Sequence, residues 1–299
     1  MNYIEQISSE LQNWNSITQK NAIHTGIFND RLVEFKNWLK IIPLTTLYRY
    51  DEKELILSFS DKYIMTKVFI AALVLIVDDI VDNSTPAIID VLDTNLSNIG
   101  KQVTIYCNKT LHDNGIDIIN RLFELGKSSV ASSDDFDFEE VINYFFKQVS
   151  LENKTIVEIL LGVRCSFNQR LLCSGTQAAS TSIKVDSHRL NVIDSPLIDE
   201  LGLNLDSLLA YKNSIGTTES EVRSGEITSP LYLLACEITG SQPIDKTGDI
   251  EWYLEVSSLV QFKTKLHEKK VELYTSIPPI LQALNLDCAR FIDSLSLII

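Results

Sequence analysis

The feature that most constrains the fold is the segment from Ile64 to Val77 (IMTKVFIAALVLIV), which is apolar on nearly every face of a helix. A helix of this kind has to be surrounded by other elements, because no face of it is suited to water. Its uninterrupted apolar part, Val68 to Val77, is too short to span a bilayer. We therefore expect a central helix inside a bundle.

The rest of the chain favours an all-α fold. Apolar residues recur at spacings of three and four, strand-like alternation is nearly absent, and only 11 glycines and 7 prolines occur in 299 residues. No repeat, linker or shift of composition divides the chain, so residues 1–299 are expected to form one domain. About a dozen helices are predicted, at 28–40, 52–60, 61–82, 87–107, 113–128, 137–150, 153–173, 195–202, 204–224, 229–238, 247–274 and 277–298.

Helix caps and loops can also be predicted. Ser60 or Asp61 is expected to cap the helix 61–82, and Asp206 or Ser207 the helix 204–224. The Ser-rich stretch from Ser174 to Lys184 is the best loop candidate, and Ser132 to Asp137 is the second. The acids of this second stretch, at positions 134, 135 and 137, are interpreted as caps of the following helix rather than as a metal site.

Charge and cysteine usage exclude several functions. The formal net charge is −14 and no block of basic residues occurs, so nucleic acid and anionic membrane surfaces are not expected as partners. Five cysteines without a CxxC pair, and four histidines without metal spacing, argue against a disulfide framework or a zinc site. The first residues are polar and mixed in charge, unlike a signal or transit peptide, so a cytoplasmic location is expected.

Three aspartates follow the apolar segment at once: Asp78, Asp79 and Asp82. Asp78 and Asp82 are four residues apart and Asp79 lies about 100° around the helix, so the carboxylates fan over one side of a single turn. The helix dipole makes negative charge least favourable at this end. A cation that neutralises the cluster would explain it; the alternative is a solvated helix end in an acidic protein.

The chemistry of such a cation can be narrowed. Hard carboxylate oxygens favour Mg²⁺ or Ca²⁺, and Mg²⁺ characteristically takes one or two carboxylates and leaves its other positions to water and substrate phosphate. The aspartate turn therefore points to a diphosphate substrate.

A second polar stripe lies in the segment YKNSIGTTESEVRSGE. Asn213, Thr217 and Glu221 are spaced four residues apart, which places them at roughly 0°, 40° and 80° around one helix. An amide, a hydroxyl and a carboxylate form an oxygen-rich site of low charge, suited to a metal that is also bound by phosphate. The alternative is an ordinary exposed helix face, since these residue types are common there.

Together the two motifs resemble those of class I terpene synthases, in which an aspartate-rich DDxxD motif ends a buried helix and an (N/D)DxxSxxxE-type stripe follows toward the C-terminus. The resemblance covers most of the chain and implies the class I terpenoid synthase fold, a helical bundle around a central apolar cavity. It implies metal ligands Asp78, Asp79 and Asp82 in the first motif. Asn213, Thr217 and Glu221 would be the ligands of the second, around three Mg²⁺ ions for which Mn²⁺ can substitute.

The resemblance also implies residues that bind the substrate. The family has an arginine that senses the diphosphate near a helix break before the second motif, and Arg170 is the first choice and Arg164 the alternative. Arg223 would add positive charge at the diphosphate. Phe69 and Tyr211 are candidate aromatic walls, because π faces stabilise a carbocation without offering a nucleophile.

The chain departs from the family pattern in two places. Ser214 stands where an acid usually follows the asparagine, although that position is not one of the usual ligands. Many bacterial members also end in an Arg-Tyr pair that closes over the diphosphate, and here Arg290-Phe291 is only a faint imitation. How the site closes is therefore left open.

The expected function is Mg²⁺-dependent ionisation of an allylic isoprenyl diphosphate, with farnesyl or geranylgeranyl diphosphate favoured, and conversion of the carbocation to a terpene. A prenyltransferase that passes the cation to a second acceptor is the first alternative; chain elongation is disfavoured because the second motif is not aspartate-rich. A non-catalytic helical binding or scaffold protein is the second alternative. A homodimer is a common arrangement in the family, and the sequence leaves the oligomeric state open.

Overall fold

The computed structural model describes residues 2–21, 30–42, 45–50, 52, 61–82, 109–130, 136–160, 162–173, 178–193 and 195–296. Within these residues the chain is a single all-helical domain without a strand, and an isolated β-bridge joins Arg49 to Leu286. The helices are α1 (Tyr3–Asn21), α2 (Arg31–Ile41), α3 (Lys62–Asp82), α5 (Lys109–Ser129), α6 (Phe138–Leu160), α7 (Phe167–Leu172), α8 (Ala178–Leu190), α9 (Pro196–Ser224), α10 (Pro230–Thr239), the 3₁₀ turn η2 (Pro243–Lys246), α11 (Ile250–Ser258), α12 (Val260–Ala283) and α13 (Cys288–Ser296).

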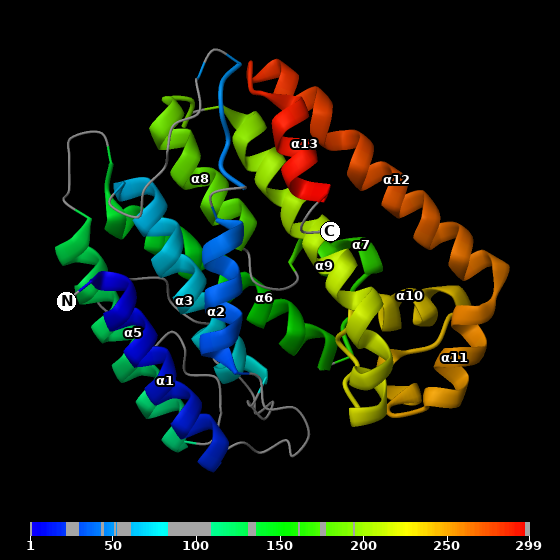
Figure 1. Ribbon diagram of the computed structural model, residues 1–299. Helices are drawn as coiled ribbons and strands as arrows, with labels where there is room; N and C mark the ends of the chain where they lie inside the picture. The colour runs from blue at the N-terminus through cyan, green and yellow to red at the C-terminus, as the bar shows by residue number, and fades with distance from the viewer. Residues whose placement is uncertain are drawn as a thin grey trace.

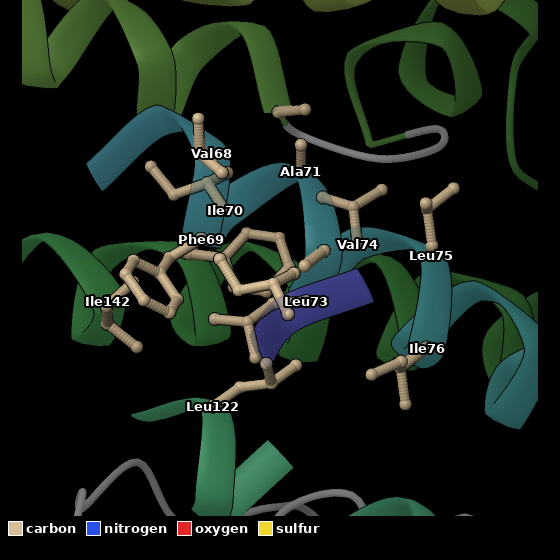
Figure 2. Close-up of a cluster of buried hydrophobic side chains, with 14 of the residues drawn as sticks. Val68, Phe69, Ile70, Ala71, Leu73, Val74, Leu75, Ile76, Leu122 and Ile142 are labelled. Atoms are coloured by element: carbon tan, nitrogen blue, oxygen red, sulfur yellow. The ribbon is translucent and has the colours of Figure 1, made fainter. Parts of the chain in front are cut away.

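The apolar helix α3 lies inside the bundle, as its sequence predicts. Every residue from Ile64 to Val77 is buried, and α1, α2, α5, α6 and α8 pack around it (Figure 1). Figure 2 shows its side chains meeting Leu122 of α5 and Ile142 of α6. In the described part of the chain, no helix has the length and apolar character needed to cross a membrane.

Two apolar clusters share one wall. The first cluster surrounds α3 and includes residues of α1, α2, α5 and α6. The second cluster contains residues of α7 and of the helices from α9 through α13. Helix α8 contributes to both, with Ala178 and Val185 in the first cluster and Ile183 and Leu190 in the second. Because α8 packs against α3 on one side and α9 on the other, it fixes the position of α9 relative to α3.

The crossing of α8 and α9 corrects two predictions. The helices expected at 195–202 and 204–224 are one continuous helix, and most of the loop expected at Ser174 to Lys184 is the start of α8. Gly202 is required inside α9 because a Cβ there would lie 2.8 Å from the Cα of Ser180. Asp206 does cap a helix, but a different one: its carboxylate accepts the N–H groups of Ala179 (3.0 Å) and Ser180 (3.1 Å) at the start of α8.

Other boundaries differ from those predicted. Helix α1 was not predicted, although Ile7, Leu11 and Trp14 have helical spacing and are completely buried. The expected helices 137–150 and 153–173 form one long helix, α6, followed by the short α7. The predicted helices 247–274 and 277–298 are also divided differently: α11 ends at Ser258, and α12 continues without a break from Val260 to Ala283, through Pro278 and Pro279.

The caps at two helix starts are confirmed. Asp61 accepts the N–H groups of Tyr63 (2.8 Å) and Ile64 (3.1 Å), and Asp137 accepts that of Glu139 (2.8 Å). The predicted helix 87–107, the predicted helix 52–60 apart from its first residue, and the acids at 134 and 135 lie outside the described residues.

A buried ion pair crosses the interface of α3 and α8. The ammonium of Lys67 lies 2.7 Å from Asp186 Oδ2, and neither side chain is more than 1% exposed. Burial lowers the pKa of Lys67 and raises that of Asp186, and each partner opposes the shift of the other. Asp186 also accepts the N–H of Leu47 (2.9 Å), so the pair ties the segment before α3 to α8.

We predict that Asp186→Ala destabilises the protein by about 3–5 kcal/mol, because it leaves the Lys67 ammonium buried without a counter-ion. The double variant Lys67→Met/Asp186→Leu removes both charges and should lose much less. Urea unfolding of the two variants measures the difference; equal losses would contradict an ionic role for the pair.

The buried carboxyl of Asp206 should make stability depend on pH. Burial raises the pKa of Asp206 from 3.8 to about 7, although its hydrogen bonds to Ser180 and Ala179 lower it. Between these two pKa values the folded state binds more protons than the unfolded state. The stability that protonated Asp206 contributes is therefore lost as the pH rises from about 4 to about 7. Asp206→Asn keeps an acceptor oxygen for one of the two N–H groups, and it should remove a loss of up to about 4 kcal/mol between about pH 4 and 8. Denaturant unfolding across this range tests the prediction, and parallel profiles for the variant and the wild type would contradict it.

Candidate functional site

The aspartate turn at the end of α3 surrounds a buried arginine. The guanidinium of Arg31, the first residue of α2, lies 2.7 Å from Asp78 Oδ2, 2.7 Å from Asp79 Oδ1 and 2.8 Å from Glu34 Oε2. Its side chain is only 3% exposed, whereas that of Asp78 is 40% exposed. The acids at this turn are therefore partly neutralised from within the chain.

The neighbouring aspartates have different environments. Asp79 is 15% exposed, and its second oxygen accepts the indole N–H of Trp14 at 2.7 Å. Both of its oxygens are thus used to hold α1 and α2 against α3. Asp82 belongs to α3, but its side chain lies outside the described residues. Of the three predicted ligands, Asp78 has the described geometry best suited to a metal.

The pKa values of Asp78 and Arg31 are both raised, but for different reasons. Burial raises the pKa of Asp78 more than the bond to Arg31 lowers it, and the charge of Asp79 adds to the rise. Burial lowers the pKa of Arg31, but its bonds to Asp79, Asp78 and Glu34 outweigh this and raise it above its ordinary value. Arg31 is therefore permanently charged.

The second stripe lies near the C-terminal end of α9. Asn213 is exposed, while Thr217 and Glu221 are half-buried. The hydroxyl of Thr217 donates to the carbonyl of Asn213 at 3.1 Å, so its lone pairs are available to a ligand. The opposite face of this part of the helix is fixed by Thr218, whose hydroxyl lies 2.6 Å from that of Ser229.

The two motifs meet electrostatically at Glu226, which follows the turn after α9. Glu226 is an exposed residue, but desolvation of its carboxyl group raises its pKa, and the negative charges of Glu221 and Asp78 add to the rise. The hydrogen bond from Thr228 and the charge of Arg170 oppose it. Charges act on a carboxyl in this way only at short range. Hydrogen bonds connect Arg170 to this segment, because Arg170 donates to the Thr228 carbonyl and the Thr228 hydroxyl donates to Glu226 at 3.0 Å.

Arg170 is buried, with 6% of the residue exposed. Its guanidinium lies 3.0 Å from Glu152 Oε1 and donates to the carbonyl oxygens of Thr228 (2.9 Å) and Cys173 (3.2 Å). It therefore joins α6, the helix break after α7 and the segment before α10.

The two other predicted cations lie in different settings. Arg164 is exposed in the segment before α7. Arg223 is exposed too, and pairs with Glu219 one turn earlier on α9 at 2.8 Å.

The predicted aromatic walls are both core residues. Phe69 is completely buried and meets the ring of Phe138 edge-on, with centroids 5.9 Å apart. Tyr211 is 2% exposed and donates to the carbonyl of Leu266 on α12 at 3.2 Å. A hollow of about 460 Å³ is lined by Asn120, Arg121 and other residues of α5, away from both motifs, and so is not the expected central cavity.

The residues fit Mg²⁺ in part. Asp78, Thr217 and Glu221 offer hard oxygens that are not completely buried, as such an ion requires. Asp79 fits less well, because Arg31 and Trp14 occupy its oxygens. Among the described side chains, no group of three or more histidines, cysteines, aspartates or glutamates is arranged to hold a metal, so a bound ion would need amide, hydroxyl, water or phosphate oxygens as well.

Sequence reasoning missed Arg31, Trp14 and Glu226. Arg31 is 47 residues before Asp78, and no spacing rule connects the first turn of one helix to the last turn of another. The helical spacing that marks α1 includes Trp14 and could have identified it as buried. Glu226 follows Gly225, whose left-handed backbone (φ 88°) ends α9 and turns the chain back toward the site.

We predict that Arg170→Leu lowers the stability by about 2–4 kcal/mol, because Glu152 and the Thr228 carbonyl lose their partner. Arg121→Leu is the matched control: Arg121 pairs with Glu10 at 2.9 Å on the surface, and its loss should cost less than about 1 kcal/mol. Chemical denaturation measures both, and similar losses would mean that Arg170 is not a structural tie.

No protein-family model, curated protein or solved structure matches this chain. The terpene synthase family accordingly stays a resemblance carried by two motifs, and any function has to be argued from the residues themselves.

Proposed function

We propose that the protein is a class I terpene synthase that binds an allylic isoprenyl diphosphate with Mg²⁺, ionises it and converts the carbocation to a terpene. The proposal is supported by the hydrogen bonds from Arg170 to the Thr228 carbonyl (2.9 Å) and from the Thr228 hydroxyl to Glu226 (3.0 Å). The negative charges of Asp78 and Glu221 also raise the pKa of Glu226. Carboxylates from two motifs and a buried guanidinium are the combination that a metal-bound diphosphate requires.

The roles of the residues follow from their oxygens and charges. Asp78 would bind metal from α3, and Asn213, Thr217 and Glu221 would do so from α9. When bound, Mg²⁺ neutralises the charge that develops on the leaving diphosphate. Arg170 would add a fixed positive charge beside it, from the C-terminal end of α7.

The environment behind the aspartate turn suits a carbocation. The last turns of α3 before Asp78 are apolar, and Val74 and Val77 are at most 4% exposed. Aliphatic side chains provide no nucleophile and exclude water, which would otherwise trap the cation. The proposed fold places the isoprenoid chain in a cavity bounded by such residues; farnesyl diphosphate is the first substrate to test.

The experiment is incubation of the purified protein with geranyl, farnesyl and geranylgeranyl diphosphate, with and without Mg²⁺, followed by mass spectrometry of the organic extract. A metal-dependent terpene from one substrate supports the proposal and identifies the chain length. Turnover only after an acceptor is added indicates a prenyltransferase. Untouched diphosphate, together with no Mg²⁺-dependent thermal stabilisation by pyrophosphate, indicates a binding or scaffold protein.

We predict that Asp78→Asn and Asn213→Ala each reduce pyrophosphate release at least about a hundredfold, because each removes a metal ligand. Asn120→Ala, at an exposed position of α5, is the matched control and should keep wild-type activity. Circular dichroism and melting temperature check that the variants fold. Near-normal release by either folded site variant would remove its residue from the proposed site.

A further inference from the structure

The aspartate turn already contains a positive charge that belongs to the chain. Arg31 contacts three carboxylates, those of Asp78, Asp79 and Glu34, at 2.7–2.8 Å. With all groups ionised, one positive charge faces three negative ones, so two negative charges are left over. A divalent cation would neutralise this remainder.

Arg31 is fixed in place as well as charged. Its backbone N–H donates to Asn15 Oδ1 at 3.0 Å, and the amide of Asn15 donates to Asp30, the N-cap of α2, at 2.7 Å. These bonds join α1 to the start of α2, so the guanidinium is held against α3 by both helices. Because a guanidinium does not lose its proton in a protein, it is a permanent counter-ion.

Asp78 is the group for which a metal and Arg31 would compete. Its Oδ2 contacts Arg31, but 40% of its side chain remains exposed. Asp79, in contrast, is held on two sides by Arg31 and Trp14 and is only 15% exposed. A cation from solvent would therefore bind at Asp78, whose carboxylate is already paired with Arg31.

We propose that Arg31 is a positioning residue of the aspartate turn, which orients Asp78 and, by competing for its carboxylate, weakens the binding of free divalent metal. The inference rests on the proposed function, since it concerns the same site. Two consequences follow from this role of Arg31. The protein is stable without a bound ion, and the site binds metal well only when a diphosphate supplies further oxygen ligands.

The test measures Mn²⁺ binding directly, without substrate, from the electron paramagnetic resonance signal of the free ion. Arg31→Gln removes the charge but keeps an amide that can donate to one aspartate. We expect its dissociation constant for Mn²⁺ to be at least about tenfold lower than that of the wild type, because a nearby positive charge is gone. Arg121→Gln makes the same change of net charge at the surface pair with Glu10 and should leave Mn²⁺ binding unchanged.

A second variant covers the case in which Arg31→Gln does not fold. Arg31→Lys keeps the buried charge, but a compact ammonium lacks the planar fork that joins two carboxylates, so Asp78 should be released in part. Its Mn²⁺ affinity should lie above that of the wild type, and Mg²⁺ should raise its melting temperature more than it raises that of the wild type. Mn²⁺ binding by the folded Arg31 variants that is equal to or weaker than wild-type binding would overturn the inference.

The outcome is separable from that of the proposed function. If the Arg31 variants bind Mn²⁺ more tightly but no diphosphate is turned over by the wild type, the competition is real and the enzymatic proposal fails. If the wild type releases pyrophosphate and the variants bind Mn²⁺ as the wild type does, only the role of Arg31 is overturned. If neither the wild type nor the variants bind Mn²⁺, even with pyrophosphate, both proposals are overturned.

Discussion

The structure depends on the burial of α3. A helix that is apolar on all sides is stable in water only when other helices cover it, and here α1, α2, α5, α6 and α8 do so. The same burial gives the helix end its character, because Asp78 and Asp79 follow directly after the covered turns. Carboxylates brought to the edge of an apolar core need counter-charges, and Arg31 from α2 supplies one.

Helix α8 packs between α3 and α9 and so fixes where the helix of the second motif lies relative to α3. It packs on α3 through the buried pair of Lys67 and Asp186, and on α9 through the close approach of Ser180 to Gly202. Asp206 reinforces the second contact by capping α8 from α9. The position of α9 relative to α3 is thereby set, and the charges of Asp78 on α3 and Glu221 on α9 both raise the pKa of Glu226.

How much could be predicted from the sequence follows from the range of the interactions involved. The extent of α3, its burial and the caps at Asp61 and Asp137 depend on neighbours within a few positions, and these predictions are confirmed. The start of α8 is capped by Asp206 from another helix, so the Ser-rich local sequence wrongly indicated a loop there. Gly202 lies inside α9 because Ser180 of α8 packs against it, so this glycine does not mark a helix end. The spacing of acidic and polar residues in the sequence identified Asp78 and Glu221 as motif residues. The effect of their charges on Glu226, and the ion pair of Asp78 with Arg31, depend on tertiary packing and could not be predicted from spacing.

The most direct measurement is a crystal structure of the protein with Mn²⁺ and pyrophosphate, in which anomalous scattering locates the metal ions. The account predicts Mn²⁺ beside Asp78 and beside the stripe of Asn213, Thr217 and Glu221, with pyrophosphate between them and Arg170 nearby. Metal ions elsewhere, or an aspartate turn still held by Arg31 alone while pyrophosphate is bound at another place, would contradict it.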